Sequence, residues 1–272
     1  MSLFKTNQNI QINYELFPNL VPTTTIFIHG NLASNRWWMP MIDVLKKQTD
    51  SHDPAILKGS VICAEFRGCG GSSVPKTEDE VTMKNFSNDF IQLLRSMNLG
   101  PVNLVGHSTG GVIAAMMLVE APELFNKAFL LDPVGAEGVK FDDAMIEAFE
   151  AMKVDRNLTA MVIGSTILNN DGESAFFKEI LVEDAFKAVK AVGHLVLKAL
   201  DGLDIRDSLK KVKHPVMVVH GDQDVLLPQT ESEKMAALFV NGRFDVLAGC
   251  GHCANIEKPE LFVQKFSQFL YT

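Results

Sequence analysis

Short apolar runs recur along the chain between helix-like stretches, and they constrain its fold more than any other feature. The runs are rich in β-branched and aromatic side chains and lack the polar alternation of a half-exposed strand. Strands with this pattern are buried on both faces, as in a parallel sheet covered by helices. We therefore predict a mostly parallel, doubly wound sheet with strands at 24–28, 60–66, 102–105, 128–131, 216–219 and 244–247.

Helical periodicity fills several intervals between these runs. Residues 83–97 place apolar side chains along one stripe, and the patterns at 108–120 and 259–270 also favour helices. Residues 10–16 alternate apolar and polar side chains, which is typical of an edge strand or a hairpin arm. Together the patterns predict the α/β class.

One long segment interrupts the alternation of strands and helices. Residues 135–205 show no convincing strand but hold helical stretches at 142–152, 158–168 and 173–200. Such an insertion is expected at the carboxyl edge of the sheet, where ligands bind in open α/β folds. We predict a core of residues 1–134 and 206–272, with 135–205 forming a helical cap or lid.

The charge balance limits the partners of this chain. There are 25 lysines and arginines against 33 aspartates and glutamates, which gives a formal charge of −8 without any basic block. We therefore expect no nucleic-acid partner and no stable membrane association. The chain begins without a signal-peptide pattern, and no apolar stretch approaches the roughly 18 residues that span a membrane. The sequence favours a cytoplasmic protein, either a monomer or a homodimer.

The cysteines give little support for a metal or redox site. There are four of them, Cys63, Cys69, Cys250 and Cys253, which are too few for a disulfide scaffold in a chain of this length. Cys250 and Cys253 form a C-x-x-C pair that suits a redox site or half of a zinc site. A second ligand pair and a strand-to-helix context are both missing. Free thiols and no metal are the better prediction.

The stretch "LVGHSTGGVIAA" places Ser108 between two glycines, after an apolar run and before a helical pattern. It matches G-x-S-x-G, in which the serine projects from a sharp strand-to-helix turn beside the first N–H groups of the helix. The alternative is a small residue that merely fills a tight turn. The flanking strand and helix favour Ser108 as a nucleophile.

A serine nucleophile needs a base, and the base needs an acid to orient it. His252 lies in a glycine-rich loop after the last apolar run, which suits a base, although a loop histidine can also be a plain surface residue. Asp224 follows the run at 216–219 and is the preferred acid, because Asp222 beside the turn glycine suits a backbone cap. Asp132 also ends a strand and remains a rival acid.

An acyl-transfer site also needs hydrogen-bond donors for the oxyanion. The backbone N–H of Thr109 is one candidate, and the turn "FIHGN" offers a second in Asn31, with Leu32 as the neighbouring alternative. His29, His107 and His220 are interpreted as structural histidines.

With these residues in place, the chain resembles the α/β-hydrolase superfamily over nearly its whole length. The resemblance rests on "HGN", "FRGCGGSS", "GHSTGG", "HGDQDVLLP" and "GCGHCANIEKP", which occur in the family's order. It implies an eight-stranded sheet with a helical cap, and no metal or organic cofactor. The implied roles are Ser108 as nucleophile, Asp224 as acid, His252 as base, and Asn31 and Thr109 as oxyanion donors.

The segment "HGNLASNRWW" is similar to the haloalkane dehalogenase and epoxide hydrolase branch, but those enzymes carry aspartate where this chain has Ser108. The family pattern also has aspartate near Glu65 and Phe66, a difference without functional weight. The resemblance therefore implies serine hydrolysis of an ester, lactone, thioester, amide or activated C–C bond.

Large apolar side chains suit a substrate pocket between cap and core. The candidates are Leu32, Trp38, His107, Phe149 and Leu226, although packing of the cap on the core would explain such residues equally well. Arg36 or Arg67 could hold a substrate carboxylate.

The main hypothesis is a hydrolase of small, apolar esters or lactones that works through an acyl-enzyme and takes a small-molecule substrate as its partner. The alternatives are an amide or C–C hydrolase, a ligand-binding protein without catalysis, and a cofactor-free oxidase or lyase with His252 as base.

Overall fold

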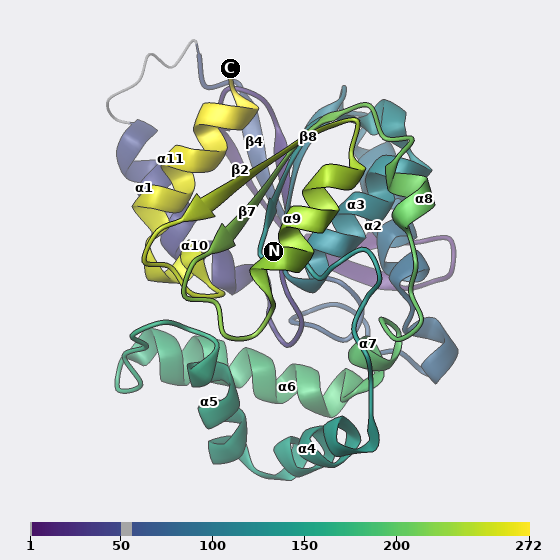
Figure 1. The fold of residues 1–272 in the computed structure, drawn as a ribbon, viewed down its shortest axis with the longest axis vertical. Coiled ribbons are helices and arrows are strands. Elements are labelled where there is room, and N and C mark those ends of the chain that lie inside the picture. Colours follow the sequence, from purple (N-terminus) through teal and green to yellow (C-terminus); the bar gives the residue numbers. More distant parts are fainter. Residues whose placement is uncertain (1, 50–55) are drawn as a thin grey trace.

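The computed structural model describes residues 2–49 and 56–272, in which an eight-stranded sheet carries helices on both faces (Figure 1). The strands lie in the order β1-β2-β4-β3-β5-β6-β7-β8. β1 and β2 are antiparallel to their neighbours, and all pairings from β4 to β8 are parallel. The predicted fold class, a mostly parallel doubly wound sheet, is confirmed. The strands are β1 Ser2–Lys5, β2 Gln11–Val21, β3 Thr25–Ile28, β4 Gly59–Ala64, β5 Val102–His107, β6 Phe125–Leu131, β7 Pro215–Gly221 and β8 Asn241–Leu247.

The helices that cover the sheet follow most of the predicted patterns. α2 and α11 have the predicted bounds, and α3 begins one residue after Ser108. Every described helix is too short or too polar to cross a lipid bilayer. The helices are α1 Met39–Thr49, α2 Met83–Met97, α3 Thr109–Glu120, α4 Asp143–Val154, α5 Arg156–Ser165, α6 Val182–Val192, α7 Leu195–Lys198, α8 Arg206–Leu209, α9 Gln229–Leu238, α10 Ala254–Glu257 and α11 Pro259–Leu270.

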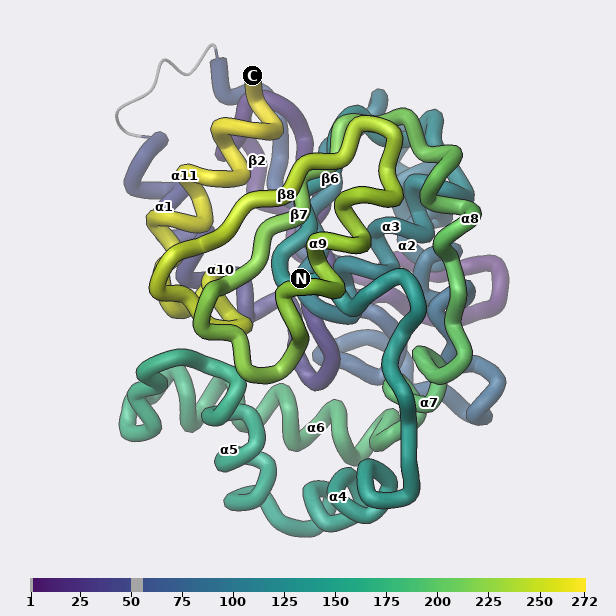
Figure 2. Tube along the Cα trace, in the orientation of Figure 1, coloured from purple at the N-terminus to yellow at the C-terminus, as the bar shows by residue number. Residues whose placement is uncertain are grey.

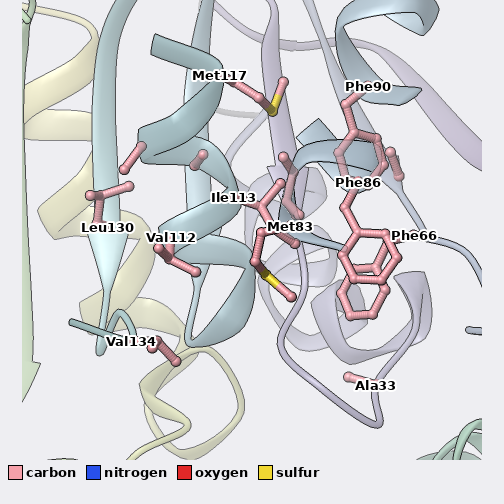
Figure 3. Packing of buried hydrophobic residues seen from close by; sticks show 14 of the residues in the cluster. Ala33, Phe66, Met83, Phe86, Phe90, Val112, Ile113, Met117, Leu130 and Val134 are labelled. Atoms are coloured by element: carbon pink, nitrogen blue, oxygen red, sulfur yellow. The ribbon is translucent and has the colours of Figure 1, made fainter. Parts of the chain in front are cut away.

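The core is divided by the sheet into two apolar layers. On one face α2 and α3 pack together, and Figure 3 shows Phe86 and Phe90 of α2 near Ile113 and Met117 of α3. On the other face α1 and α11 form the second layer. The inner strands are buried on both sides, which explains why they appear in the sequence as unbroken apolar runs.

The segment between β6 and β7 is helical, as predicted, but one of its expected helices is interrupted. The expected helix at 173–200 consists of a π-helix, Phe176–Leu181, that continues into α6, followed after a break by α7. The break comes at Gly193, whose φ of 52° lies in the left-handed region. The bounds 135–205 for a separate cap domain stay a prediction.

The helical segment lies beyond the carboxyl ends of the central strands. Figures 1 and 2 show α4, α5 and α6 in a separate layer, with the chain returning to the core through α7 and α8. Parallel strands end at one edge, so the loops after β5, β6, β7 and β8 meet there. Those loops carry Ser108, Asp132, Asp224 and His252.

The aromatic packing on the α2 face gives a test of the core. Phe86 is fully buried, and its ring lies 5.0 Å from the ring of Phe66. We expect Phe86→Ala to lower the free energy of unfolding by about 3–5 kcal/mol, because the cavity it leaves cannot collapse fully. Urea unfolding would measure the loss, with Leu99→Ala at an exposed position as the control. Equal losses in the two variants would contradict this packing.

Candidate active site

Ser108 sits on a strained turn between β5 and α3. Its φ of 54° and ψ of −121° lie outside the regions that non-glycine residues favour, at a cost of roughly 1–3 kcal/mol. The flanking glycines are needed because the backbones come close. A side chain at Gly106 would overlap the carbonyl of Gly110, and one at Gly110 would overlap the carbonyl of Ile28. The turn leaves Ser108 at the wall of a cavity.

His252 and Asp224 meet at this cavity from neighbouring loops. His252 Nδ1 lies 2.8 Å from Asp224 Oδ2, and the other carboxylate oxygen accepts from the backbone N–H groups of Leu226 and Leu227. Burial opposes ionisation of Asp224, but the hydrogen bonds from His252 and the backbone outweigh it and lower the pKa of this carboxyl. With Nδ1–H donated to a carboxylate, Nε2 of His252 is left as the basic nitrogen.

The rival acid, Asp132, lies in the same region but has other hydrogen-bond partners than His252. Its side chain is fully buried, and its Oδ1 accepts the Gly221 N–H at 2.8 Å and lies 3.1 Å from His220 Nδ1. His252 has its hydrogen bond to Asp224 instead. The geometry therefore supports Asp224 as the partner of the base.

The predicted oxyanion donors lie on the same cavity wall. Thr109 opens α3, and the first N–H groups of a helix have no partner within it. On the other side, the Leu32 N–H donates to the side-chain oxygen of Asn31 at 2.9 Å. Because this bond occupies the Leu32 N–H, the backbone N–H of Asn31 is the better second donor.

The three histidines that the sequence analysis assigned to structure, His29, His107 and His220, are all buried. Burial lowers the pKa of His29 to about 4 despite its bond to the Gly30 carbonyl. Burial, with the nearby His252, lowers the pKa of His107 to about 3. His107 Nε2 lies 2.8 Å from the backbone carbonyl of His252, so it donates a proton to that carbonyl and holds the base loop against β5.

The cavity has a volume of about 260 Å³ and a largely apolar lining. Leu32, His107, Phe149 and Leu226 line it, where the sequence analysis placed them. The prediction for Trp38 is wrong. Its ring packs against Phe27 and Phe262 in the apolar layer that α1 and α11 form on the sheet. Consecutive residues of the short 3-10 helix Asn35–Trp38 point in different directions, and the preceding residue, Trp37, faces the cavity instead.

The sequence analysis missed part of the lining. These residues come from the loop after β6, from the helical segment and from the position after His252, where no motif marks them. They include Val134, Ile163, Thr166, Leu197 and Cys253. The sequence analysis predicted free thiols, and all four cysteines are free; the structure adds that they are buried.

Neither arginine considered for a substrate carboxylate reaches the cavity. Arg36 pairs with Asp184 of α6, and Arg67 forms a fully buried pair with Asp89 of α2 at 2.6 Å. Both guanidinium groups are thus satisfied within the protein. The described lining of the cavity contains no lysine or arginine.

One group of side chains has the spacing of a metal site. Asp132, His220 and Asp224 bring ligand atoms within 4.8 Å of one another. Asp224 Oδ2 is committed to His252, however, and His220 Nδ1 lies 2.9 Å from Ser232 Oγ. This cluster is better explained as part of the hydrogen-bond network behind the base.

Comparison with known proteins agrees with this geometry. A sequence profile of the alpha/beta hydrolase fold matches residues 24–259, and the chain belongs to that family. It is 23% identical to 3-oxoadipate enol-lactonase 2 of Acinetobacter baylyi over 94% of this chain and 92% of that protein. It is also 23% identical to the uncharacterized hydrolase YugF of Bacillus subtilis, over 97% of this chain and 96% of that protein.

Solved structures show the same fold. The esterase EaEST from Exiguobacterium antarcticum matches with a TM-score of 0.82 at 18% identity, covering 100% of this chain and 99% of that one.

The buried state of His107 predicts how stability depends on pH. The ordinary pKa of 6.5 falls to about 3 in the folded protein, so below pH 6.5 the unfolded chain takes up a proton that the folded chain does not. The contribution of His107 to the free energy of unfolding is fully present above pH 6.5 and is lost as the pH falls toward 3. His107→Gln keeps an N–H donor without the titration.

We expect the wild type to lose about 1.4 kcal/mol per pH unit relative to His107→Gln between about pH 6 and pH 4. Urea unfolding of both proteins at several pH values would measure this difference. A difference that stays constant over the interval would show that His107 does not titrate in this way.

Proposed function

We propose that this protein is a serine hydrolase that cleaves small, apolar carboxylic esters or lactones through an acyl-enzyme. The observation that carries the proposal is the 2.8 Å hydrogen bond from His252 to Asp224 at a cavity whose wall also holds Ser108. The relatives named as a lactonase and an esterase support the same reaction class. The nucleophile, acid and base follow one another in the order that the family uses.

The reaction begins when Ser108 Oγ attacks the carbonyl carbon and His252 Nε2 accepts its proton. The oxyanion that forms is held by the backbone N–H groups of Asn31 and Thr109. Collapse of this intermediate expels the alcohol, which takes its proton from His252. Water, activated by the same imidazole, then hydrolyses the ester bond to Ser108. Asp224 stabilises the imidazolium in both halves of the reaction.

The lining of the cavity indicates which acyl groups suit it. Apolar side chains dominate, and the titratable side chains among the lining residues are His107, His252 and Cys253. A substrate carboxylate would be buried there without a cationic partner, at a cost of several kcal/mol. We therefore expect neutral acyl groups. Val162 and Leu226 line the cavity and are also exposed, so the apolar surface continues outward to accommodate a longer chain.

The acyl-enzyme is tested by the pre-steady-state hydrolysis of p-nitrophenyl esters. We expect a burst near one equivalent in the wild type and a kcat lower by about 10³-fold or more in Ser108→Ala. Ser267→Ala on the distant helix α11 is the matched control and should keep the burst. Full turnover by Ser108→Ala would exclude the serine mechanism. Tight ligand binding without turnover in the wild type would favour the binding-protein alternative.

The preference for neutral substrates is tested with two esters of similar length. We expect kcat/KM for p-nitrophenyl butyrate to exceed that for mono-p-nitrophenyl succinate by about tenfold or more, because only the succinate ester brings a carboxylate into the cavity. The test is a steady-state measurement of both esters at low and high salt. Equal values, or a preference for the succinate ester, would contradict an apolar acyl site.

A further inference from the structure

We propose that Asp132 carries a proton at neutral pH and donates it in a hydrogen bond to Asp224, which makes Asp132 a positioning residue for the acid of the triad. The catalytic consequence rests on the proposed function. The protonation of Asp132 does not depend on the proposed function, and it can be tested without any substrate.

The position of Asp132 is fixed by the backbone. It follows β6 with a φ of 41°, which is unusual for a non-glycine residue, and its N–H donates to the Val219 carbonyl of β7 at 2.9 Å. Its side chain is fully buried. The carboxyl group therefore cannot turn toward water to satisfy its oxygen atoms.

The two oxygen atoms of this carboxyl have different surroundings. Oδ1 accepts the Gly221 N–H at 2.8 Å, whereas Oδ2 is buried with no hydrogen-bond donor among the described residues. Ligand oxygens of the Asp132 and Asp224 carboxyl groups lie within 4.8 Å of each other. Two negative charges this close in a buried site repel each other, and protonation of one carboxyl removes the repulsion and supplies an O–H donor.

The donors around the pair decide which carboxyl is ionised. Asp224 accepts hydrogen bonds from His252, from the Leu226 N–H and from the Leu227 N–H, which stabilise its negative charge. Asp132 accepts one backbone N–H, and burial followed by the charge of Asp224 raises its pKa well above the usual range. The proton therefore belongs on Asp132.

The other titratable groups near Asp132 do not neutralise it. His220 of β7 lies 3.1 Å away, but burial lowers the pKa of its imidazole, which donates to the Leu227 carbonyl. Glu257 of α10 adds negative charge and raises the pKa of Asp132 further. Among the described residues, no lysine or arginine forms an ion pair with Asp132. A neutral Asp132 avoids placing a second buried negative charge beside Asp224.

Infrared spectroscopy tests the proton directly. At pH 7 we expect the wild type to show the C=O stretching band of a protonated carboxylic acid that shifts in heavy water and is absent from Asp132→Asn. The exposed Asp222→Asn, on the loop after β7, is the matched control and should retain the band. A wild type without that band at pH 7 would overturn the proposal.

The pH dependence of stability gives a second readout. The unfolded carboxyl loses its proton near pH 3.8, whereas the folded one keeps it, so stability from this proton is complete below pH 3.8 and is lost as the pH rises. Between about pH 5 and pH 7, the folding equilibrium constant of the wild type should fall about tenfold per pH unit relative to Asp132→Asn. A ratio that does not change with pH would show that Asp132 is ionised in the folded protein.

The positioning role is tested by activity. The side-chain amide in Asp132→Asn keeps an N–H donor toward Asp224, so this variant should retain kcat/KM within about threefold of the wild type. Asp132→Ala removes the donor, and its kcat should fall about tenfold or more with KM nearly unchanged. Equal losses in the two variants would contradict the role of the donated proton. If no ester is hydrolysed at all, the proposed function fails, while the infrared and stability measurements still decide the state of Asp132.

Discussion

Burial of a parallel sheet on both faces is the constraint on which the rest of this structure depends. Apolar side chains must occupy both sides of β3 through β7. The polar side chains of the site therefore lie at the ends of the strands. The parallel direction brings those ends to one edge. A serine, two aspartates and a histidine from four separate loops meet there without any regularity in their spacing along the chain.

The same burial determines the charge of the groups at this edge. Where backbone N–H groups and an imidazole converge, as at Asp224, the carboxyl is stabilised as an anion. Where they do not, as at Asp132 and His107, burial favours the neutral form. A short distance in space thus separates a carboxyl whose surroundings favour the charged form from groups whose surroundings favour the neutral form. Desolvation and the number of donors, rather than residue type, decide between them.

The sequence predicts much of the core because burial on both faces leaves a local pattern. It predicts less where the local pattern is weak. β1 is a short edge strand with mostly exposed residues, so it lacks the apolar run of the inner strands. The interruption of the helix expected at 173–200 depends on the backbone at Gly193 rather than on periodicity.

At the site, motifs and strand order indicate which loops carry chemistry, since the geometry of a parallel sheet fixes where loops end. They do not indicate side-chain direction. Which of the two adjacent tryptophans faces the cavity, Trp37 or Trp38, depends on the rotation of a single 3-10 turn. The separate surroundings of Asp132 and Asp224 depend on backbone donors that residue identity does not reveal.

The ion pair between Arg36 and Asp184 has a consequence for how the helical layer is attached to the sheet. It joins the loop after β3 to α6, and Asp184 is nearly buried and also accepts a hydrogen bond from Ser34. Moving α6 away from the core would leave that carboxylate without its partners, whereas α4 and α5 expose apolar side chains such as Val154 and Met161. The helical layer is therefore anchored to the core at α6 by a buried charge, because separating the two would leave that charge without its partners.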